Sequence, residues 1–259
     1  MGDQPHPLRV GFSILRARRT ASPRPSGTDR VDHASLGGVL EAVRNNGVRS
    51  LPEHRSALVA YRDRLEAIDP DGLSRHEALA YWVNLYNAGA LVLAGEAQQE
   101  GRETVLRVPG GFSRTWAGVA GEELSLDDVE HGKIRRFGDP RIHGALVCGS
   151  VSCPTLRFEP YAGDRLDAQL DAQMRAFLAG GGARVDRDRG VLGLSRVFLW
   201  YGGDFTRPHR MPTWLPARKR RLTSVISRWL SPADATWVAQ TTPTVDFAPY
   251  DWALACSIA

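Results

Sequence analysis

The chain has 259 residues, of which 42% are hydrophobic and 24% are charged. This is the composition of an ordinary globular protein, so it excludes a chain that is disordered or fibrous throughout. The length is sufficient to bury a sizeable core in one large domain or two small ones.

The net charge of +4 is concentrated near the N-terminus. Residues 1–30 contain six arginines and two aspartates, whereas residues 31–259 carry 27 basic and 27 acidic side chains. A body without net charge exerts no long-range attraction on polyanions, so we expect no nucleic-acid binding by residues 31–259. RNA or phosphate binding through residues 1–30 and the basic run 218–221 stays open as an alternative, although no aromatic residues interleave with that run.

Three cysteines are too few for a disulfide framework, which favours a reducing cytoplasm. The N-terminus lacks an apolar run of signal-peptide length. The most apolar stretch, Ala78–Gly95, contains Asn84 and Asn87 and is interpreted as a buried helix. We therefore expect a cytoplasmic protein without a membrane span.

Residues 1–30 are rich in arginine, proline, serine and glycine and have no hydrophobic period. This pattern predicts a disordered arm on which folding of the remaining chain does not depend. No long linker divides the rest, so residues 31–259 are predicted to form a single domain.

Helical patterns dominate the first half of the chain. Amphipathic stretches at 36–45 and 51–68 predict two helices. Ser74 lies three residues before Glu77, the spacing of a capping box, and predicts the start of a long apolar helix from Arg75 to about Gln99.

Short elements follow this helix. Val105–Val108 is predicted to be extended, and residues 112–124 to form a hairpin. Ser125 with Asp128 predicts a helix that continues to about Arg136. The run Arg141–Cys148 (RIHGALVC) is predicted to be a short buried strand, followed by a loop at 149–161.

The second half alternates helical and extended patterns, and Asp164 is predicted to cap the first helix. The remaining expected elements are a helix at 165–178, a hairpin at 185–194, a helical turn at 196–201, helices near 218–230 and 233–240, and an extended piece at 245–247. The whole pattern predicts an α+β fold, a helix-rich domain around a small β-sheet.

The densest group of reactive side chains lies at 139–154 (DPRIHGALVCGSVSCP). Thiol catalysis needs a thiolate, a base within hydrogen-bond reach and donors for an oxyanion. In a regular strand His143 and Cys148 would point to opposite faces, whereas Cys153 can fold back beside His143. We expect Cys153 to be the nucleophile and His143 its general base.

The same residues allow two other interpretations. A loop of serines and cysteines can simply be buried and satisfy backbone groups. A metal site of His131, His143, Cys148 and Cys153 is also conceivable, but their spacing does not match paired zinc ligands, so we predict no metal and no cofactor.

His131 is an alternative base. Asp127 precedes it by four residues, so the two side chains share one face of a regular helix. A neighbouring carboxylate raises the pKa of an imidazole and fixes its orientation. An exposed ion pair on a helix surface is the competing interpretation.

Further candidates would bind the substrate. Asn84 and Asn87 lie three residues apart in the apolar helix and point the same way, so they bond either an adjoining loop or a substrate amide. Ser152 and Cys148 adjoin the predicted nucleophile, and Tyr201 lies in the aromatic run LWYGGDF.

Five segments resemble, in this order, the domain of unknown function 547 family. They are AYWVNLYNAGAL, SLDDVEHGKIRR, DPRIHGALVCGSVSCPTL, LDAQLDAQMRAFL and PYDW. The resemblance implies a family-like core at about 73–205 and matches the family pattern at Asn84, Asn87, His131, His143, Ser152, Cys153 and Pro154. Because that family carries no established activity, the resemblance supports the choice of residues more than the choice of reaction.

Two functions remain. The first is a cysteine-dependent hydrolase or acyl transferase that acts on an amide or thioester of an unknown small molecule or peptide. The alternative is a non-catalytic binding or scaffold domain. In that domain the Asn, His, Ser and Cys side chains form a structural hydrogen-bond network that fixes the segment of His143 against the helix of Asn84.

Overall fold

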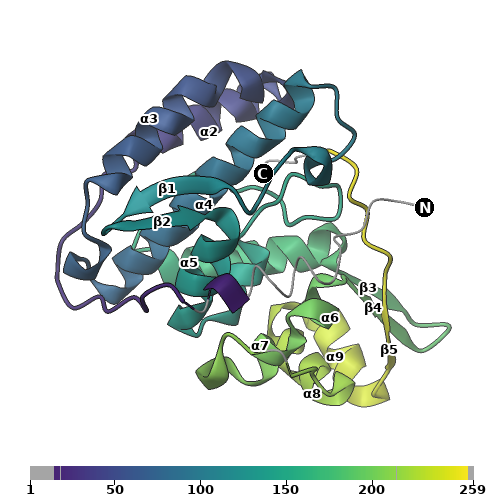
Figure 1. Cartoon of the computed structure of the whole chain (residues 1–259). Helices are drawn as coiled ribbons and strands as arrows, with labels where there is room; N and C mark the ends of the chain where they lie inside the picture. Colours follow the sequence, from purple (N-terminus) through teal and green to yellow (C-terminus); the bar gives the residue numbers. More distant parts are fainter. Residues whose placement is uncertain (1–14, 18, 214, 256–259) are drawn as a thin grey trace.

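The computed structural model of the chain describes residues 15–17, 19–213 and 215–255. Its fold is α+β, with helices in the majority and two small sheets instead of the one predicted (Figure 1). Among the described helices, none is both long and apolar enough to cross a membrane.

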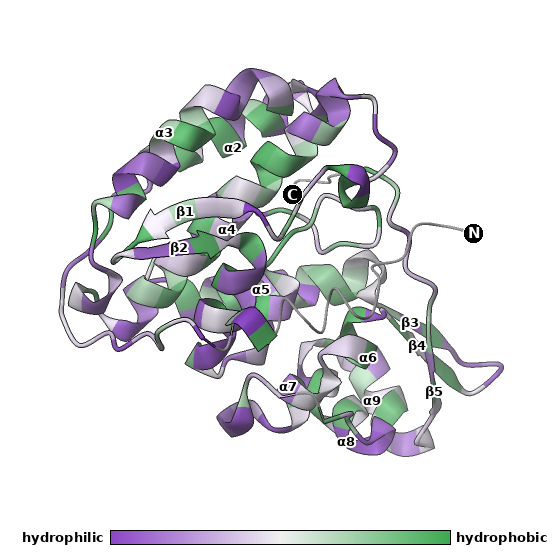
Figure 2. Ribbon diagram, viewed as in Figure 1, coloured by the Kyte–Doolittle hydropathy of each residue, from purple (hydrophilic) through white to green (hydrophobic). Residues whose placement is uncertain are grey.

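Three helices form one side of the molecule: α2 (Ala34–Asn46), α3 (Arg55–Glu66) and α4 (Arg75–Gln99). Helix α3 packs against both of the others (Figure 1). The backbone N–H of Glu77 donates to Ser74 Oγ at 3.3 Å, as the capping pattern predicts. Helix α4 is buried over most of its length, and the green segments of its ribbon in Figure 2 mark its hydrophobic residues.

The predicted hairpin is confirmed as β1 (Thr115–Val119) paired antiparallel with β2 (Glu122–Ser125). Trp116 fixes it to α4, since its indole N–H donates to the carbonyl of Leu85 at 3.0 Å. A side chain at Gly89 would come within 2.7 Å of the Trp116 ring, so only glycine permits this close packing.

The helix predicted after Ser125 is present but irregular. It consists of a π-helical segment, η4 (Asp128–Lys133), followed by the 3₁₀ turn η5 (Ile134–Phe137). Ser125 Oγ accepts a hydrogen bond from the N–H of Asp128 at 3.1 Å, in agreement with the predicted start.

Three local predictions were wrong. Residues 105–107 form a 3₁₀ turn, η3 (Val105–Arg107), and Arg165 occupies the position before α5 without a side-chain cap from Asp164. The run 141–148 is not a strand: Pro140 starts the 3₁₀ helix η6 (Pro140–Gly144), and Asp139 caps it by accepting from the N–H of Arg141 at 3.0 Å. Proline and an aspartate cap favour a helix start, which overrides the apolar pattern.

The second half agrees with the predicted element types. Helix α5 is followed by β3 and β4, an antiparallel pair, and β5 joins β4 in parallel. The bounds are α5 Leu166–Phe177, β3 Ala183–Asp186, β4 Val191–Leu194, α6 Val197–Trp200, α7 Gly202–Thr206, α8 Lys219–Ile226, α9 Pro232–Thr241 and β5 Thr244–Phe247. Short 3₁₀ or π turns complete the chain: η1 Val48–His54, η2 Pro70–Gly72, η7 Leu178–Gly182, η8 Pro208–Arg210 and η9 Ser227–Trp229.

Buried apolar side chains form two clusters. The first extends from α2 to the start of α5, and the second from the end of α5 to residue 250. Helix α5 contributes Leu170 to the first and Met174 to the second. Cys153 packs on the first cluster and Cys148 on the second, so the loop that carries both thiols lies where the clusters meet.

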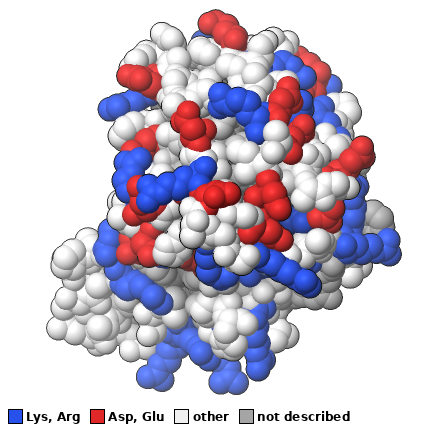
Figure 3. All heavy atoms as spheres, turned by 90° about the vertical axis from the view of Figure 1, so that its left-hand side faces the viewer, with Lys and Arg blue, Asp and Glu red and all other residues white. Residues whose placement is uncertain are grey.

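Acidic and basic side chains lie next to each other over most of the face shown in Figure 3, and basic ones gather at its lower end. This mixture fits the zero net charge of residues 31–259.

Part of the predicted arm lies on the folded body. Residues 1–14 and 18 are outside the described residues. Ala17 is buried, and the carbonyl groups of Thr20 and Ala21 accept hydrogen bonds from the folded body. Arg136 donates to the carbonyl of Thr20, and Lys133 to that of Ala21, each at 2.8 Å. The arm is irregular, as its composition predicts, but these contacts with Lys133 and Arg136 were not predicted.

We expect deletion of residues 1–22 to lower the free energy of unfolding by about 1–3 kcal/mol, because Lys133 and Arg136 lose carbonyl partners. Urea unfolding of the full and shortened chains measures this difference. Deletion of residues 1–13 is the matched control, since it removes no described contact. Equal stability of all three chains would show that the arm adds nothing to the fold.

Candidate functional site

A buried ion pair joins the two halves of the fold. Arg135 on η5 and Asp204 on α7 have side chains that are 1% and 0% exposed. Arg135 Nε donates to Asp204 Oδ2 at 2.8 Å, and Nη2 donates to Oδ1 at 3.1 Å. The N–H of Thr213 also donates to Asp204 at 3.0 Å, so the carboxylate is fixed from several directions.

Asp204 also holds His143. The Nε2 atom of His143 lies 2.9 Å from Asp204 Oδ2. The imidazole stacks on the ring of Tyr201, with centroids 4.0 Å apart and an interplanar angle of 17°. Its Nδ1 atom has no hydrogen-bond partner among the described residues. One nitrogen is thus oriented by a carboxylate while the other is available.

The charges around Asp204 govern its ionisation. Burial raises the pKa of this carboxyl, but the hydrogen bond and charge of His143 and the guanidinium of Arg135 outweigh burial and lower the pKa to about 2. Asp204 is therefore ionised at neutral pH and can stabilise a positive charge on His143.

His131 lies beside the same network. Its Nδ1 is 3.4 Å from Arg135 Nη1 and 3.5 Å from the carboxylate of Glu130. Burial lowers the pKa of His131 to about 4, which Glu130 opposes only partly. The imidazole is neutral at pH 7. Glu130, the residue before His131 in the π-helical segment η4, thus supplies a carboxylate beside this imidazole. The pairing of His131 with Asp127 stays a prediction.

Two tyrosines, the buried Tyr86 and the half-buried Tyr201, lie beside the histidine network. Tyr201 covers His143 on one side, and its hydroxyl bonds Glu130. The hydroxyl of Tyr86, on α4, interacts electrostatically with Glu130, Tyr201 and both cysteines. Burial raises the pKa of both phenols well above the usual value, so both are protonated at neutral pH.

The two thiols form a pair inside a tight loop. Cys153 Sγ accepts the backbone N–H of Cys148 at 2.7 Å. Cys148 Sγ lies 3.0 Å from Ser150 Oγ and 3.3 Å from the hydroxyl of Tyr250. The hydrogen bond with Cys153, followed by those with Ser150 and Tyr250, lowers the pKa of Cys148 to about 7 despite its burial.

The C-terminal segment holds this loop in place. The N–H of Val151 donates to the carbonyl of Ala253 at 3.0 Å, and that of Ser152 to Asp251 at 3.2 Å. Ser152 Oγ accepts the N–H of Asp251 at 2.9 Å. Ser152, predicted to contact substrate, thus positions the loop.

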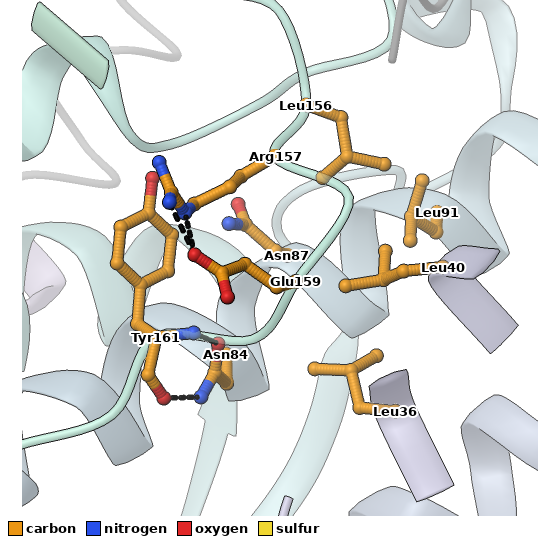
Figure 4. Close-up of a pocket in the computed structure, with 9 residues that line it drawn as sticks. All are labelled: Leu36, Leu40, Asn84, Asn87, Leu91, Leu156, Arg157, Glu159 and Tyr161. Carbon is orange, nitrogen blue, oxygen red and sulfur yellow. Dashed lines mark hydrogen bonds and ion pairs between the residues drawn. The ribbon is translucent and has the colours of Figure 1, made fainter. Parts of the chain in front are cut away.

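Both asparagines of α4 bind the backbone of the following loop. Asn84 exchanges two hydrogen bonds with Tyr161, at 2.8 and 2.9 Å (Figure 4). Asn87 donates to the carbonyl of Ala145 and accepts the N–H of Val147, each at 3.1 Å. Of the two roles weighed from the sequence, these contacts match the bond to an adjoining loop.

A narrow pocket adjoins the asparagines, between α2, α4 and the loop that contains Arg157, Glu159 and Tyr161 (Figure 4). Its volume of about 10 Å³ is room for roughly one water. Arg157 Nε donates to Glu159 at 3.0 Å along its polar side. A substrate amide does not fit into this space.

The structure thus brings His131, His143 and Tyr201 into one network, and Tyr86 interacts electrostatically with this network and with both thiols. Sequence reasoning missed Tyr86, Glu130 and Arg135, and it assigned no partner to Ser150, Asp204 and Tyr250, which complete both parts. A usable signal was the single acid in the apolar run LWYGGDF. The described residues contain no group of three or more His, Cys, Asp and Glu side chains arranged to hold a metal, so the metal site weighed above is not formed.

Residues 70–178 match the model of the family described as "Protein of unknown function, DUF547". This segment is a DUF547 domain. It contains Asn84, Asn87, both histidines and the thiol loop, whereas Asp204 and Tyr250 come from the chain beyond it. No curated protein and no solved structure matches the chain.

We expect His131 to make the protein sensitive to mild acid. In the unfolded chain this histidine takes up a proton near pH 6.5, but in the fold only near pH 4. Its stabilising contribution is therefore complete above pH 6.5 and is lost as the pH falls through 4, by up to about 3 kcal/mol.

Urea unfolding at several pH values between 4 and 7 measures this slope. His131→Asn should flatten it, whereas His209→Gln, at an exposed position, should not. A slope that His131→Asn leaves unchanged would contradict the assignment.

Asp204→Ala is expected to lower the free energy of unfolding by about 3–5 kcal/mol, since it leaves the buried guanidinium of Arg135 without its counter-charge. Asp63→Ala is the matched control: this exposed partner of Arg62 should contribute less than about 1 kcal/mol. Denaturant titration distinguishes them, and equal effects would show that the buried pair is unimportant.

Proposed function

We propose that this DUF547 protein is a cysteine-dependent hydrolase or acyl transferase. The observation that carries the proposal is the buried contact of 2.9 Å between His143 and Asp204, in a fold that also lowers the pKa of the Cys148 thiol to about 7. A carboxylate that orients an imidazole, together with an activated thiol, is the arrangement used in nucleophilic acyl transfer.

Cys148 is the nucleophile in this proposal, in place of Cys153. Its sulfur has three hydrogen-bonding neighbours, the thiol of Cys153 and the hydroxyls of Ser150 and Tyr250. These stabilise the thiolate, which is the reactive form. Cys153 acts as the partner whose proton the thiolate shares.

His143 serves as the general base and acid. Asp204 fixes its Nε2, so the unpartnered Nδ1 can exchange a proton with the thiol or the leaving group. Cys148 and Tyr201 pack on the same apolar cluster, and Tyr201 stacks on His143, which supports a short path between sulfur and imidazole. His131 is the weaker candidate for the general base, because an imidazole with a pKa of about 4 is a poor proton acceptor at pH 7.

The reaction has two steps. The Cys148 thiolate attacks the acyl carbon of an amide or thioester, and His143 protonates the amine or thiol that leaves. Water or an acceptor nucleophile then gives its proton to His143 and attacks the resulting thioester, which releases the acyl group and restores the thiol.

Alkylation by iodoacetamide from pH 5 to 9 tests the nucleophile, with Cys256→Ser as background and peptide mapping to assign each modified thiol. We expect the alkylation rate of Cys148 to reach half its maximum near pH 7, matching its lowered pKa. Tyr250→Phe and Ser150→Ala should raise that midpoint. Tyr161→Phe is the matched control, because its hydroxyl has no partner in the described structure.

Hydrolysis of p-nitrophenyl acetate tests the base. His143→Gln should slow both acylation and deacylation by about 10²-fold or more, as loss of a general base does, while His131→Gln should slow neither. A midpoint near pH 8.5 for both cysteines, typical of ordinary thiols, would refute the proposal.

A non-catalytic role is the second candidate, and the asparagine contacts favour it. Both carboxamides of α4 are occupied by backbone groups, as expected of a structural network. Under this reading Asn87→Ala lowers stability by about 1–3 kcal/mol, and His143→Gln changes no thiol reactivity. Ordinary alkylation of Cys148 together with this loss of stability would favour the scaffold role.

A further inference from the structure

A second pocket is lined in part by Phe205, whose ring lies near that of His143. It has a volume of about 420 Å³ and opens between η6, α5, α7 and the turn after α8. Its wall includes Pro140, Phe205 and Trp229 together with the charged residues Arg141, Arg175 and Arg228. This is the size of a site for a small organic molecule.

The acidic side chains of the pocket form ion pairs with Arg141. Asp139 and Asp171 both pair with Arg141, at 2.6 and 3.3 Å, and Asp167 joins them from outside at 2.6 Å. Asp171 also accepts the indole N–H of Trp229 at 2.8 Å. The pocket lining contains two carboxylates, Asp139 and Asp171, and three guanidinium groups, a net charge of +1. Arg141 forms the ion pairs with both carboxylates, and the charge of Arg175 also acts on Asp171.

Two other arginines are not compensated in this way. Neither Arg175 nor Arg228 forms an ion pair with a carboxylate in the described part of the chain. Arg228 lies over the ring of Trp229, 4.6 Å from its centroid, and its Nε donates to the carbonyl of Val225 at 3.0 Å. The terminal nitrogens of both guanidinium groups remain available to an anion.

We propose that this pocket binds a small organic anion, with a phosphate or carboxylate between Arg175 and Arg228 and a planar apolar part against Phe205 and Pro140. Arginine is suited to such groups because its planar fork donates two parallel hydrogen bonds. The aromatic and proline side chains supply the flat apolar wall.

The pocket shares its walls with the His143 network. Helix η6 contributes Pro140 to the pocket and carries His143, and α7 presents Phe205 to the pocket and Asp204 to His143. The rings of Phe205 and His143 are 5.7 Å apart. The binding site does not depend on the proposed acyl-transfer activity, because its arginines lie outside the thiol site.

Isothermal titration of the full chain with phenyl phosphate tests the proposal. We expect saturable binding that quenches tryptophan fluorescence, since Trp229 forms one wall. The double variant Arg175→Gln, Arg228→Gln should bind phenyl phosphate at least about tenfold more weakly, because two charge-assisted hydrogen bonds are lost. Arg189→Gln, at an exposed turn far along the chain, is the matched control and should bind as the parent does.

Two further probes identify the ligand class. Benzyl alcohol lacks the charge and inorganic phosphate lacks the ring, so both should bind more weakly than phenyl phosphate, and benzoate should compete with it. The proposal is overturned if phenyl phosphate does not bind, if the double variant binds it equally well with an unchanged melting temperature, or if phosphate alone binds as tightly. Thiol alkylation is measured separately, so failure here does not bear on the proposed nucleophile.

Discussion

The salt bridge between Arg135 and Asp204 is the contact on which the rest of the site depends. A guanidinium and a carboxylate that are both removed from water must remain paired, since an isolated buried charge costs several kcal/mol. The pairing fixes η5 against α7, and α7 belongs to the second half of the chain. His143 then takes its orientation from the same carboxylate. One electrostatic requirement therefore docks two parts of the fold and aligns an imidazole.

Local signals predicted much of the fold. The cap at Ser74, the hairpin before Ser125 and the helices of the second half follow from contacts between residues near each other in sequence. The strand predicted at 141–148 is not formed, because this segment pairs with a side chain of α4 and not with another strand. Asn87 occupies the carbonyl of Ala145 and the N–H of Val147, groups that a neighbouring strand would otherwise bond.

The site was predictable only in part, for a related reason. Its reactive side chains share one sequence block, so their chemistry is visible there, but the groups that tune them are distant. Asp204 is 61 residues from His143 and Tyr250 is 102 from Cys148. The π-helical winding of η4 was also not visible in the sequence. Neither long-range pairing nor an irregular helix leaves a periodic signal.

The hydrogen bonds between the C-terminal segment and the thiol loop have a consequence for synthesis of the chain on the ribosome. Tyr250 bonds Ser150 across a separation of 100 residues, and Asp251 secures Ser152 across 99. At roughly 5–20 residues per second, a ribosome needs several seconds to make the chain between them. During that interval the loop lacks its last strand-like partner, and Cys148 lacks the phenol that helps to acidify it. The nascent chain therefore lacks one of the hydrogen bonds that lower the pKa of Cys148, and the full set forms only after Tyr250 has left the ribosome.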